Sequence, residues 1–190
     1  GNETITGATQ AVTIDAGGGD DTLIVTATGQ VQAADRYDGG LGTDTLQIGL
    51  AGAGVTVDLS GAASDGVNGF LNIEALTFTN TSGTSTATFS AAQFGSGRIS
   101  TAAAVTGTGS TNALVINLTT DGTLDLAGWT FNTWTSGTDT ITVTGSTGSE
   151  QITGSSVIDR FVVVDSSQVS AGDKSSTPGD CHGMQAPRLP

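Results

Sequence analysis

The chain is poor in the residues on which many binding and catalytic sites depend. Of its 190 residues only five are Lys or Arg and one is His, against 18 Asp or Glu, which gives a net charge of −13. This charge disfavours nucleic acids and anionic membrane surfaces as partners, and it favours cations. The single histidine, His182, lies outside the repeats described below, so they contain no Ser-His-Asp arrangement. We therefore predict that the chain is not an enzyme.

Cysteine, proline and long apolar runs are also scarce. The single cysteine, Cys181, excludes an internal disulfide framework. No apolar run approaches the roughly 18 to 20 residues that cross a bilayer, and no N-terminal targeting signal is visible, so we expect no membrane span. All three prolines follow Gly172, where the composition changes abruptly. We predict that residues 171–190 form a tail that is disordered or foreign to the repeat fold.

Glycine, by contrast, is abundant, and its spacing is the main signal. Residues 39–47, GGLGTDTLQ, fill every defined position of the nonapeptide G-G-x-G-x-D-x-U-x, in which U is a large apolar residue. The pattern predicts a tight turn followed by a short strand. Gly39, Gly40 and Gly42 would take backbone angles that a side chain forbids. Because side chains alternate along a strand, Leu46 would face the core.

A second copy precedes this one. Residues 16–24, AGGGDDTLI, repeat the pattern with Asp21 at the acidic position. Asp21 follows Glu3 by two nonapeptides, so both carboxylates are expected on one edge of a roll. The separation between Asp21 and Asp44 is longer than two nonapeptides, which indicates an insertion within residues 27–37 that could break the stack. On the opposite edge Val12 stands where an acid is expected, so that edge is predicted to be weak or metal-free.

Residues 50–135 lack the glycine-aspartate pattern but keep short stretches of alternating apolar residues. Residues 55–59 and 114–118 are the clearest. Alone, such strands fit a parallel solenoid or an antiparallel sandwich; the flanking nonapeptides favour the solenoid. We therefore predict an all-β fold, a parallel β-solenoid of the β-roll or β-helix type with glycine-rich turns. At roughly 20 residues per turn, about eight turns would fit.

The pattern returns in a degenerate form within residues 136–170. We accordingly divide the chain into repeats at 1–49, a solenoid spacer at 50–135, degenerate repeats at 136–170 and the tail at 171–190. The degenerate copies carry Asp139, Glu150 and Asp159 at or near the acidic position, and these are weaker candidates. Four acids of the spacer are predicted to be solvated turn or strand-face residues: Asp58, Glu74, Asp121 and Asp125.

The copies at 16–24 and 39–47 resemble the haemolysin-type calcium-binding repeats of RTX (repeats-in-toxin) proteins. The resemblance implies a β-roll in which Ca²⁺ sits between successive turns, held by aspartate carboxylates and by carbonyls of the glycine loops. Carried over to this chain, the implied metal ligands are Gly17, Gly19, Asp21, Gly40, Gly42 and Asp44. Glu3 and Glu150 are one methylene longer than the aspartate of the family pattern.

The resemblance also implies a biological setting. We expect a calcium-binding structural module within a larger bacterial protein that is exported by a type I system and that is secreted or displayed on the cell surface. Folding would then follow contact with extracellular calcium. The expected partners are calcium ions and the remainder of the parent protein.

Other interpretations stay open at the level of sequence. Asp and Gly are common in any turn, so the loops could be ordinary turns. An adhesive, ice-binding or carbohydrate-binding solenoid without calcium is suggested by threonine pairs, namely Thr77/Thr79, Thr86/Thr88, Thr140/Thr142 and Thr142/Thr144. Trp129, Phe131 and Trp134 could stack a sugar ring or close an edge of the solenoid. A polysaccharide-active β-helix is disfavoured by the scarcity of basic residues.

Overall fold

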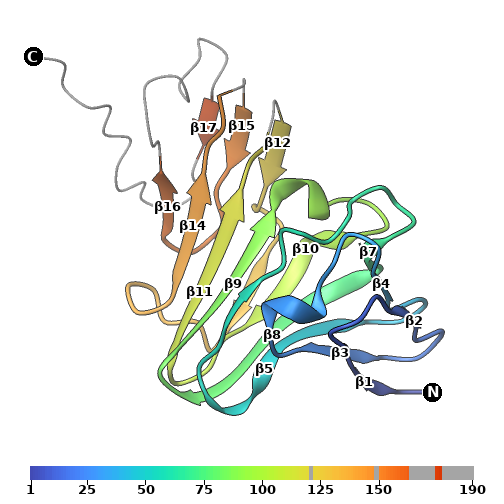
Figure 1. Ribbon diagram of the computed structural model, residues 1–190. Helices are drawn as coiled ribbons and strands as arrows, with labels where there is room; N and C mark the ends of the chain where they lie inside the picture. Colours follow the sequence, from blue (N-terminus) through green and yellow to red (C-terminus); the bar gives the residue numbers. More distant parts are fainter. Residues whose placement is uncertain (120–121, 148–149, 163–173, 177–190) are drawn as a thin grey trace, which may run out of the picture.

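The computed structural model describes residues 1–119, 122–147, 150–162 and 174–176. The regular secondary structure of these residues is almost entirely β-strand, and the strand pairs are parallel. The chain winds as a β-solenoid, with the N-terminal strands at one end of the stack and β14 and β16 toward the other (Figure 1). The predicted all-β parallel solenoid is confirmed.

One sheet runs through most of the solenoid and receives a strand from each turn. Its strands, in spatial order, are β1 (Thr4–Thr6), β3 (Thr22–Val25), β5 (Thr45–Ala53), β8 (Ile73–Ser82), β10 (Ile99–Thr106) and β13 (Thr130–Asn132). The register pairs Thr4 with Thr22, Thr22 with Thr45 and Thr45 with Ala75. Equivalent residues of successive turns are therefore 18, 23 and 30 residues apart at the N-terminal end.

The remaining strands form three further parallel sheets within the described residues. The larger contains β6 (Thr56–Asp58), β9 (Thr84–Ser90), β11 (Thr111–Asn117), β14 (Thr140–Thr144) and β16 (Asp159–Val162). The smaller two contain β2 (Thr13–Asp15), β4 (Arg36–Asp38) and β7 (Gly69–Leu71), and β12 (Gly122–Asp125), β15 (Glu150–Thr153) and β17 (Lys174–Ser176). Two short 3₁₀ segments, η1 (Thr28–Gln30) and η2 (Ala91–Gln93), lie at corners.

The number of turns differs from the sequence prediction. Turns of 30 residues occur in the middle of the chain, where Thr45 pairs with Ala75 and Thr56 pairs with Thr86. A short turn recurs only near the C-terminal end, where Ile141 pairs with Asp159. The described chain thus makes about five turns. The prediction of eight was wrong because it extended the compact repeat of the chain's ends across a spacer whose corners are longer.

The core follows from the alternation along each strand. Leu23, Leu46 and Leu76 lie at equivalent positions of successive turns and are fully buried. Burial of such a side chain stabilises the fold by roughly 1.5–3 kcal/mol. Aromatic rings add a second column, in which Trp129 is 2% exposed and its ring centroid lies 5.4 Å from that of Phe94. Trp129 therefore packs inside the solenoid and offers no surface for a sugar ring.

The predicted disordered tail lies largely outside the described residues. Only Lys174–Ser176 of residues 171–190 are described, and they form β17, which pairs with β15. Cys181 and His182 lie outside the described residues.

Candidate metal site

A column of acidic side chains crosses successive turns at the N-terminal part of the solenoid. Glu3, Asp21 and Asp44 directly precede β1, β3 and β5, and Glu74 is the second residue of β8. These four residues are in register in successive turns, and we call them the acid column. The N–H of Glu3 donates to Asp21 Oδ1 over 2.6 Å. The N–H of Asp21 donates to Asp44 Oδ1 over 2.8 Å. Each carboxylate therefore accepts the amide of the preceding turn.

The insertion between Asp21 and Asp44 does not break this column. The extra residues form a corner around η1, and the side chain of Gln30 ties that corner to its neighbours. Gln30 Nε2 donates to the carbonyl oxygen of Gly7 over 2.5 Å, and its Oε1 accepts the N–H of Thr26 over 2.6 Å. The predicted stacking of Glu3 and Asp21 is confirmed by the register of β1 and β3. The register of β3 and β5 adds Asp44 to the same column, so the insertion does not break it.

The glycines stack backbone on backbone. Gly17, Gly19, Gly40 and Gly42 all have positive φ angles, of 93°, 125°, 95° and 145°. A Cβ on Gly42 would lie 1.9 Å from the carbonyl oxygen of Gly19, and one on Gly40 would lie 2.1 Å from that of Gly17. Only glycine therefore fits at positions 40 and 42. The oxygen of Gly17 accepts the N–H of Leu41 over 2.8 Å, so a main-chain hydrogen bond also links the two turns.

Two carboxylate oxygens in the acid column have no hydrogen-bond partner. Asp21 is 1% exposed and Asp44 is fully buried, and Oδ2 of each is buried without a donor. Leaving a buried polar group unpaired costs about 1–3 kcal/mol, and more when the group is charged. Burial raises the pKa of Asp44; the amide of Asp21 lowers it, and the nearby charges of Asp21, Asp20 and Asp38 raise it further. The site therefore has negative charge that a cation would compensate.

The acid on the opposite edge is satisfied without a cation. Asp35 occupies the position that corresponds to Val12 in the next turn, because Thr13 pairs with Arg36. It is fully buried, and it accepts the N–H of Val12 over 2.8 Å and that of Gln32 over 2.7 Å. The sequence prediction identified Val12 but missed Asp35, which lies within the insertion and belongs to no repeat.

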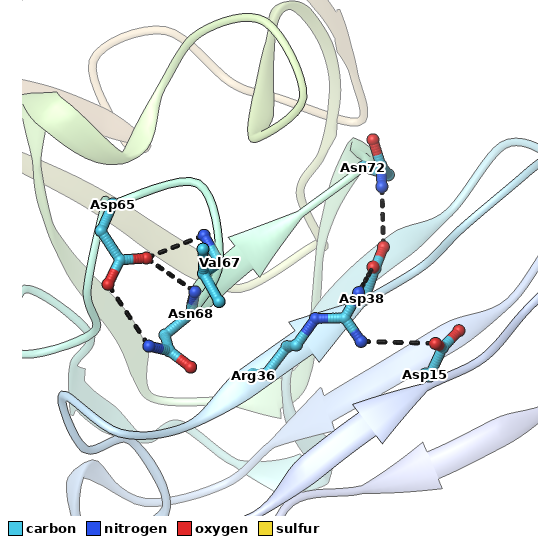
Figure 2. Close-up of polar contacts among 7 residues, drawn as sticks. All are labelled: Asp15, Arg36, Asp38, Asp65, Val67, Asn68 and Asn72. Carbon is cyan, nitrogen blue, oxygen red and sulfur yellow. Dashed lines mark hydrogen bonds and ion pairs between the residues drawn. The ribbon is translucent and has the colours of Figure 1, made fainter.

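Asp38, which directly precedes the glycine turn at 39–42, is also fully paired (Figure 2). Arg36 lies between Asp38 and Asp15 and forms an ion pair with each carboxylate, at 3.3 Å for Asp15. The side-chain amide of Asn72 donates to Asp38 Oδ1 over 2.7 Å. Arg36 thus neutralises this acid and the Asn72 amide pairs with its second oxygen, whereas Asp21 and Asp44 have no such partners within the described residues.

The acids of the degenerate copies close their own turns. Each accepts the N–H of the residue four positions earlier: Asp139 from Thr135, Glu150 from Ser146 and Asp159 from Ser155. The other oxygen of Asp139 accepts from Asn112 over 2.8 Å, and Oδ1 of Asp159 accepts the Ser155 hydroxyl over 2.9 Å. Burial raises the pKa of Asp159, and the two hydrogen bonds from Ser155 partly offset that rise. Among the described residues, none of these three acids has a buried carboxylate oxygen that lacks a hydrogen-bond partner, so none requires a bound cation.

Two of the four spacer acids are solvated as predicted. Asp58 and Asp125 are exposed, and Asp121 lies outside the described residues. Glu74 is half-buried, and its Oε2 accepts the N–H of Asp44 over 2.8 Å. The expectation that Glu74 is a solvated strand-face residue was wrong, because the long turn between β5 and β8 brings it onto Asp44.

Asp65 shows how an exposed acid in the spacer is used. Its Oδ1 accepts the N–H groups of Asn68 and Val67 over 2.7 and 2.8 Å, and these hydrogen bonds lower the pKa of Asp65 (Figure 2). This local turn buries no charge, so it carries no argument for a metal.

The donor set of the acid column fits a hard cation. No three His, Cys, Asp or Glu side chains in the described part of the chain gather as a metal cluster. A cation between Asp21 and Asp44 would therefore take two carboxylates and complete its shell with main-chain oxygens and water. Ca²⁺ accepts this mixture, since it binds six to eight oxygen ligands in flexible geometry.

Comparison with family models, with curated proteins and with solved structures gave no match to this chain. No helix in the described ranges is long and apolar enough to cross a membrane.

Proposed function

We propose that this chain is a calcium-binding structural module of a secreted or cell-surface bacterial protein. The observation that carries the proposal is the pair of buried carboxylate oxygens, Asp21 Oδ2 and Asp44 Oδ2, that have no hydrogen-bond donor. They lie in adjacent turns on one edge, within the complete glycine-aspartate repeat at 39–47 and the copy at 16–24 that differs from it only by Ala16 in place of the first glycine. The other fully buried acid, Asp35, has a donor for each oxygen. Unpaired charge therefore coincides with the repeats that predict a calcium site.

Each residue type has a distinct role in this proposal. Asp21 and Asp44 supply charge, and Gly17, Gly19, Gly40 and Gly42 form the stacked turns whose main-chain oxygens complete the ligand shell. Bound calcium would neutralise the carboxylates and link consecutive turns. In its absence the two acids repel each other and destabilise the N-terminal turns, so metal binding and folding are coupled.

The proposed setting follows from the affinity that such sites have. Extracellular calcium modules bind at about 10⁻⁴ to 10⁻³ M, so they fill outside the cell and stay empty in the cytosol. We propose that the chain forms part of an RTX-type protein exported by a type I system, and that it serves as a non-enzymatic structural segment. The two in-register nonapeptides and the net charge of −13 support this assignment.

The test is a titration of the chelator-treated chain with calcium and, in parallel, with magnesium. The thermal midpoint and the far-ultraviolet circular dichroism signal are measured at each metal concentration. Calcium at 100 times its Kd is expected to add about 2.7 kcal/mol to the free energy of unfolding. The double variant Asp21→Asn/Asp44→Asn should lose this gain. The exposed pair Asp58→Asn/Asp125→Asn changes the net charge equally and should keep it. An equal response to magnesium, or a gain that survives in the first double variant, would overturn the proposal.

The adhesive alternative lacks an observation of this kind. Thr77 and Thr79 lie on β8, in the six-stranded sheet, whereas Thr86/Thr88 and Thr140/Thr142 lie on β9 and β14, in the five-stranded sheet. The pairs thus belong to two sheets, and β11 separates the second from the third with Ala113 and Val115 at the equivalent positions. They do not combine into one continuous threonine surface.

A further inference from the structure

The turn that follows the last complete repeat places main-chain and carboxylate oxygens next to Asp44. A Cβ on Gly39 would lie 2.5 Å from the carbonyl oxygen of Asn72 and 2.5 Å from Asp44 Cγ. The Asn72 carbonyl and the Asp44 side chain therefore both pack against Gly39 and lie close to each other, which is possible because residue 39 has no side chain. Asp44 Oδ2, fully buried and without a donor, belongs to this carboxyl group.

Asn72 is held rigidly in the conformation that presents this carbonyl. Its φ angle is +50°, in the left-handed region that asparagine tolerates better than most residues. Its side chain donates to Asp38 Oδ1 over 2.7 Å (Figure 2), and its N–H donates to the carbonyl oxygen of Gly97. The carbonyl oxygen is thus oriented by contacts on both sides of the residue.

Glu74 supplies the second carboxylate of this turn. Its Oε2 accepts the Asp44 N–H, and no donor or basic group within the described residues pairs with its Oε1. Glu74 and Asn72 also line a surface pocket of about 320 Å³, which gives solvent access to these two residues. Arg98 is on the pocket wall, but it donates to the carbonyl oxygen of Ala92 over 3.0 Å and forms no ion pair with Glu74.

We infer that a second divalent cation site lies between the turns of β5 and β8, formed by Asp44, Glu74 and the Asn72 carbonyl. The inference rests on the proposed calcium binding by the acid column and extends it into a segment that contains no nonapeptide. Asp44 is shared by both sites, while Asp21 belongs to the first and Glu74 to the second. The three protein oxygens and the open pocket suit Ca²⁺, which accepts carboxylate, carbonyl and water ligands together.

The number of ions bound tests this inference. Isothermal titration calorimetry of the full chain with CaCl₂ is expected to give two ions for the wild type and one each for Glu74→Gln and Asp21→Asn. Glutamine at 74 keeps an acceptor for the Asp44 N–H, so the column stays hydrogen-bonded. Asp58→Asn, an exposed acid outside the column, should leave the number at two.

The outcomes separate this inference from the proposed function. If Glu74→Gln binds as many ions as the wild type with unchanged Kd, while Asp21→Asn loses one, the second site is absent and the first stands. If the wild type binds no calcium, both proposals fail.

An independent check that does not weaken the ligand set is Arg98→Gln, which removes a positive charge from the pocket wall. It is expected to lower the Kd of the ion lost in Glu74→Gln by about fivefold, and an unchanged Kd would count against the site.

Discussion

At the scale of the residue, one hydrogen bond is repeated along the solenoid. A side-chain oxygen at the start of a strand accepts the N–H of the equivalent residue in the preceding turn. Asp44 does so for Asp21, and Ser85 does so for Val55 over 3.2 Å. The serine shows that this bond needs no charge. What distinguishes Asp21 and Asp44 is the second oxygen, which remains unpaired.

The glycines allow a graded test of the stacked turns. Gly42→Ala combines a φ of +145° with a contact of 1.9 Å to the carbonyl oxygen of Gly19, whereas Gly17→Ala has a φ of +93° and no atom within 4 Å of its Cβ. Gly17→Ala is expected to cost about 1–2 kcal/mol in the free energy of unfolding. Gly42→Ala should cost more, because backbone must also move.

Gly29→Ala is the matched control, since its Cβ would meet nothing within 4 Å and its φ is not positive. Urea unfolding of the three variants in saturating calcium gives the loss in the free energy of unfolding for each substitution. Equal losses for Gly42→Ala and Gly17→Ala would show that the turns are not packed as closely as described.

At the scale of the element, a buried glutamine anchors each 3₁₀ corner. Gln30 closes η1, and Gln93 closes η2 in a similar way: its Oε1 accepts the N–H of Ser90, and its Nε2 donates to the carbonyl oxygens of Leu59 and Ala62. Both the oxygen and the nitrogen of the carboxamide therefore form hydrogen bonds with the main chain. A longer corner can therefore be inserted into a turn without disturbing the strands on either side.

Gln93→Glu tests this anchoring with almost no change of shape. The substitution replaces a donor with a carboxylate oxygen that faces two carbonyl oxygens at a position that is 1% exposed. We expect a loss of about 3 kcal/mol in the free energy of unfolding at pH 7. Gln32→Glu adds the same charge at an exposed residue and should cost about 1 kcal/mol or less. Thermal unfolding compares the two, and similar losses would contradict an anchoring role for Gln93.

The elements also show what the sequence could and could not predict. The repeat identifies Asp21 and Asp44 because each lies in its own recognisable nonapeptide, and equal repeat lengths predict the stacking of Glu3 on Asp21. Glu74 escaped prediction because a long stretch without a motif separates it from Asp44, and spacing alone does not set a register across irregular corners. Asp35 escaped because it sits in an insertion. The local pattern thus predicts strands and turns, while cross-turn partners depend on the full path of the chain.

At the scale of the whole molecule, a net charge of −13 is combined with acids that are buried in the stack. Asp159, which is 3% exposed, illustrates the consequence for stability. Because burial raises the pKa of Asp159, the folded state binds its proton more tightly than the unfolded state does. The resulting stabilisation is fully present below the unfolded pKa of about 3.9 and is lost as pH rises through the higher folded pKa.

Asp159→Asn is therefore expected to reduce the fall in thermal midpoint that the wild type shows between about pH 4 and pH 7. Asparagine keeps an acceptor for the Ser155 N–H, so the turn is preserved. Asp125→Asn makes the same change in net charge at an exposed site and should leave the profile unaltered. Measurements in chelator remove any contribution from calcium. Parallel profiles for Asp159→Asn and the wild type would show that burial of this acid does not affect stability.

The amide-to-carboxylate bond of the acid column gives the stack a polarity. Along it, the N–H comes from the earlier turn and the carboxylate from the later one, from Glu3 through Asp21 and Asp44 to Glu74. A turn is therefore completed only by its successor. When the chain folds from its N-terminus, the newest turn always offers bare amide donors, and the next acid to arrive closes them. We therefore expect the turns of the acid column to form in sequence order, each without a contribution from a distant segment.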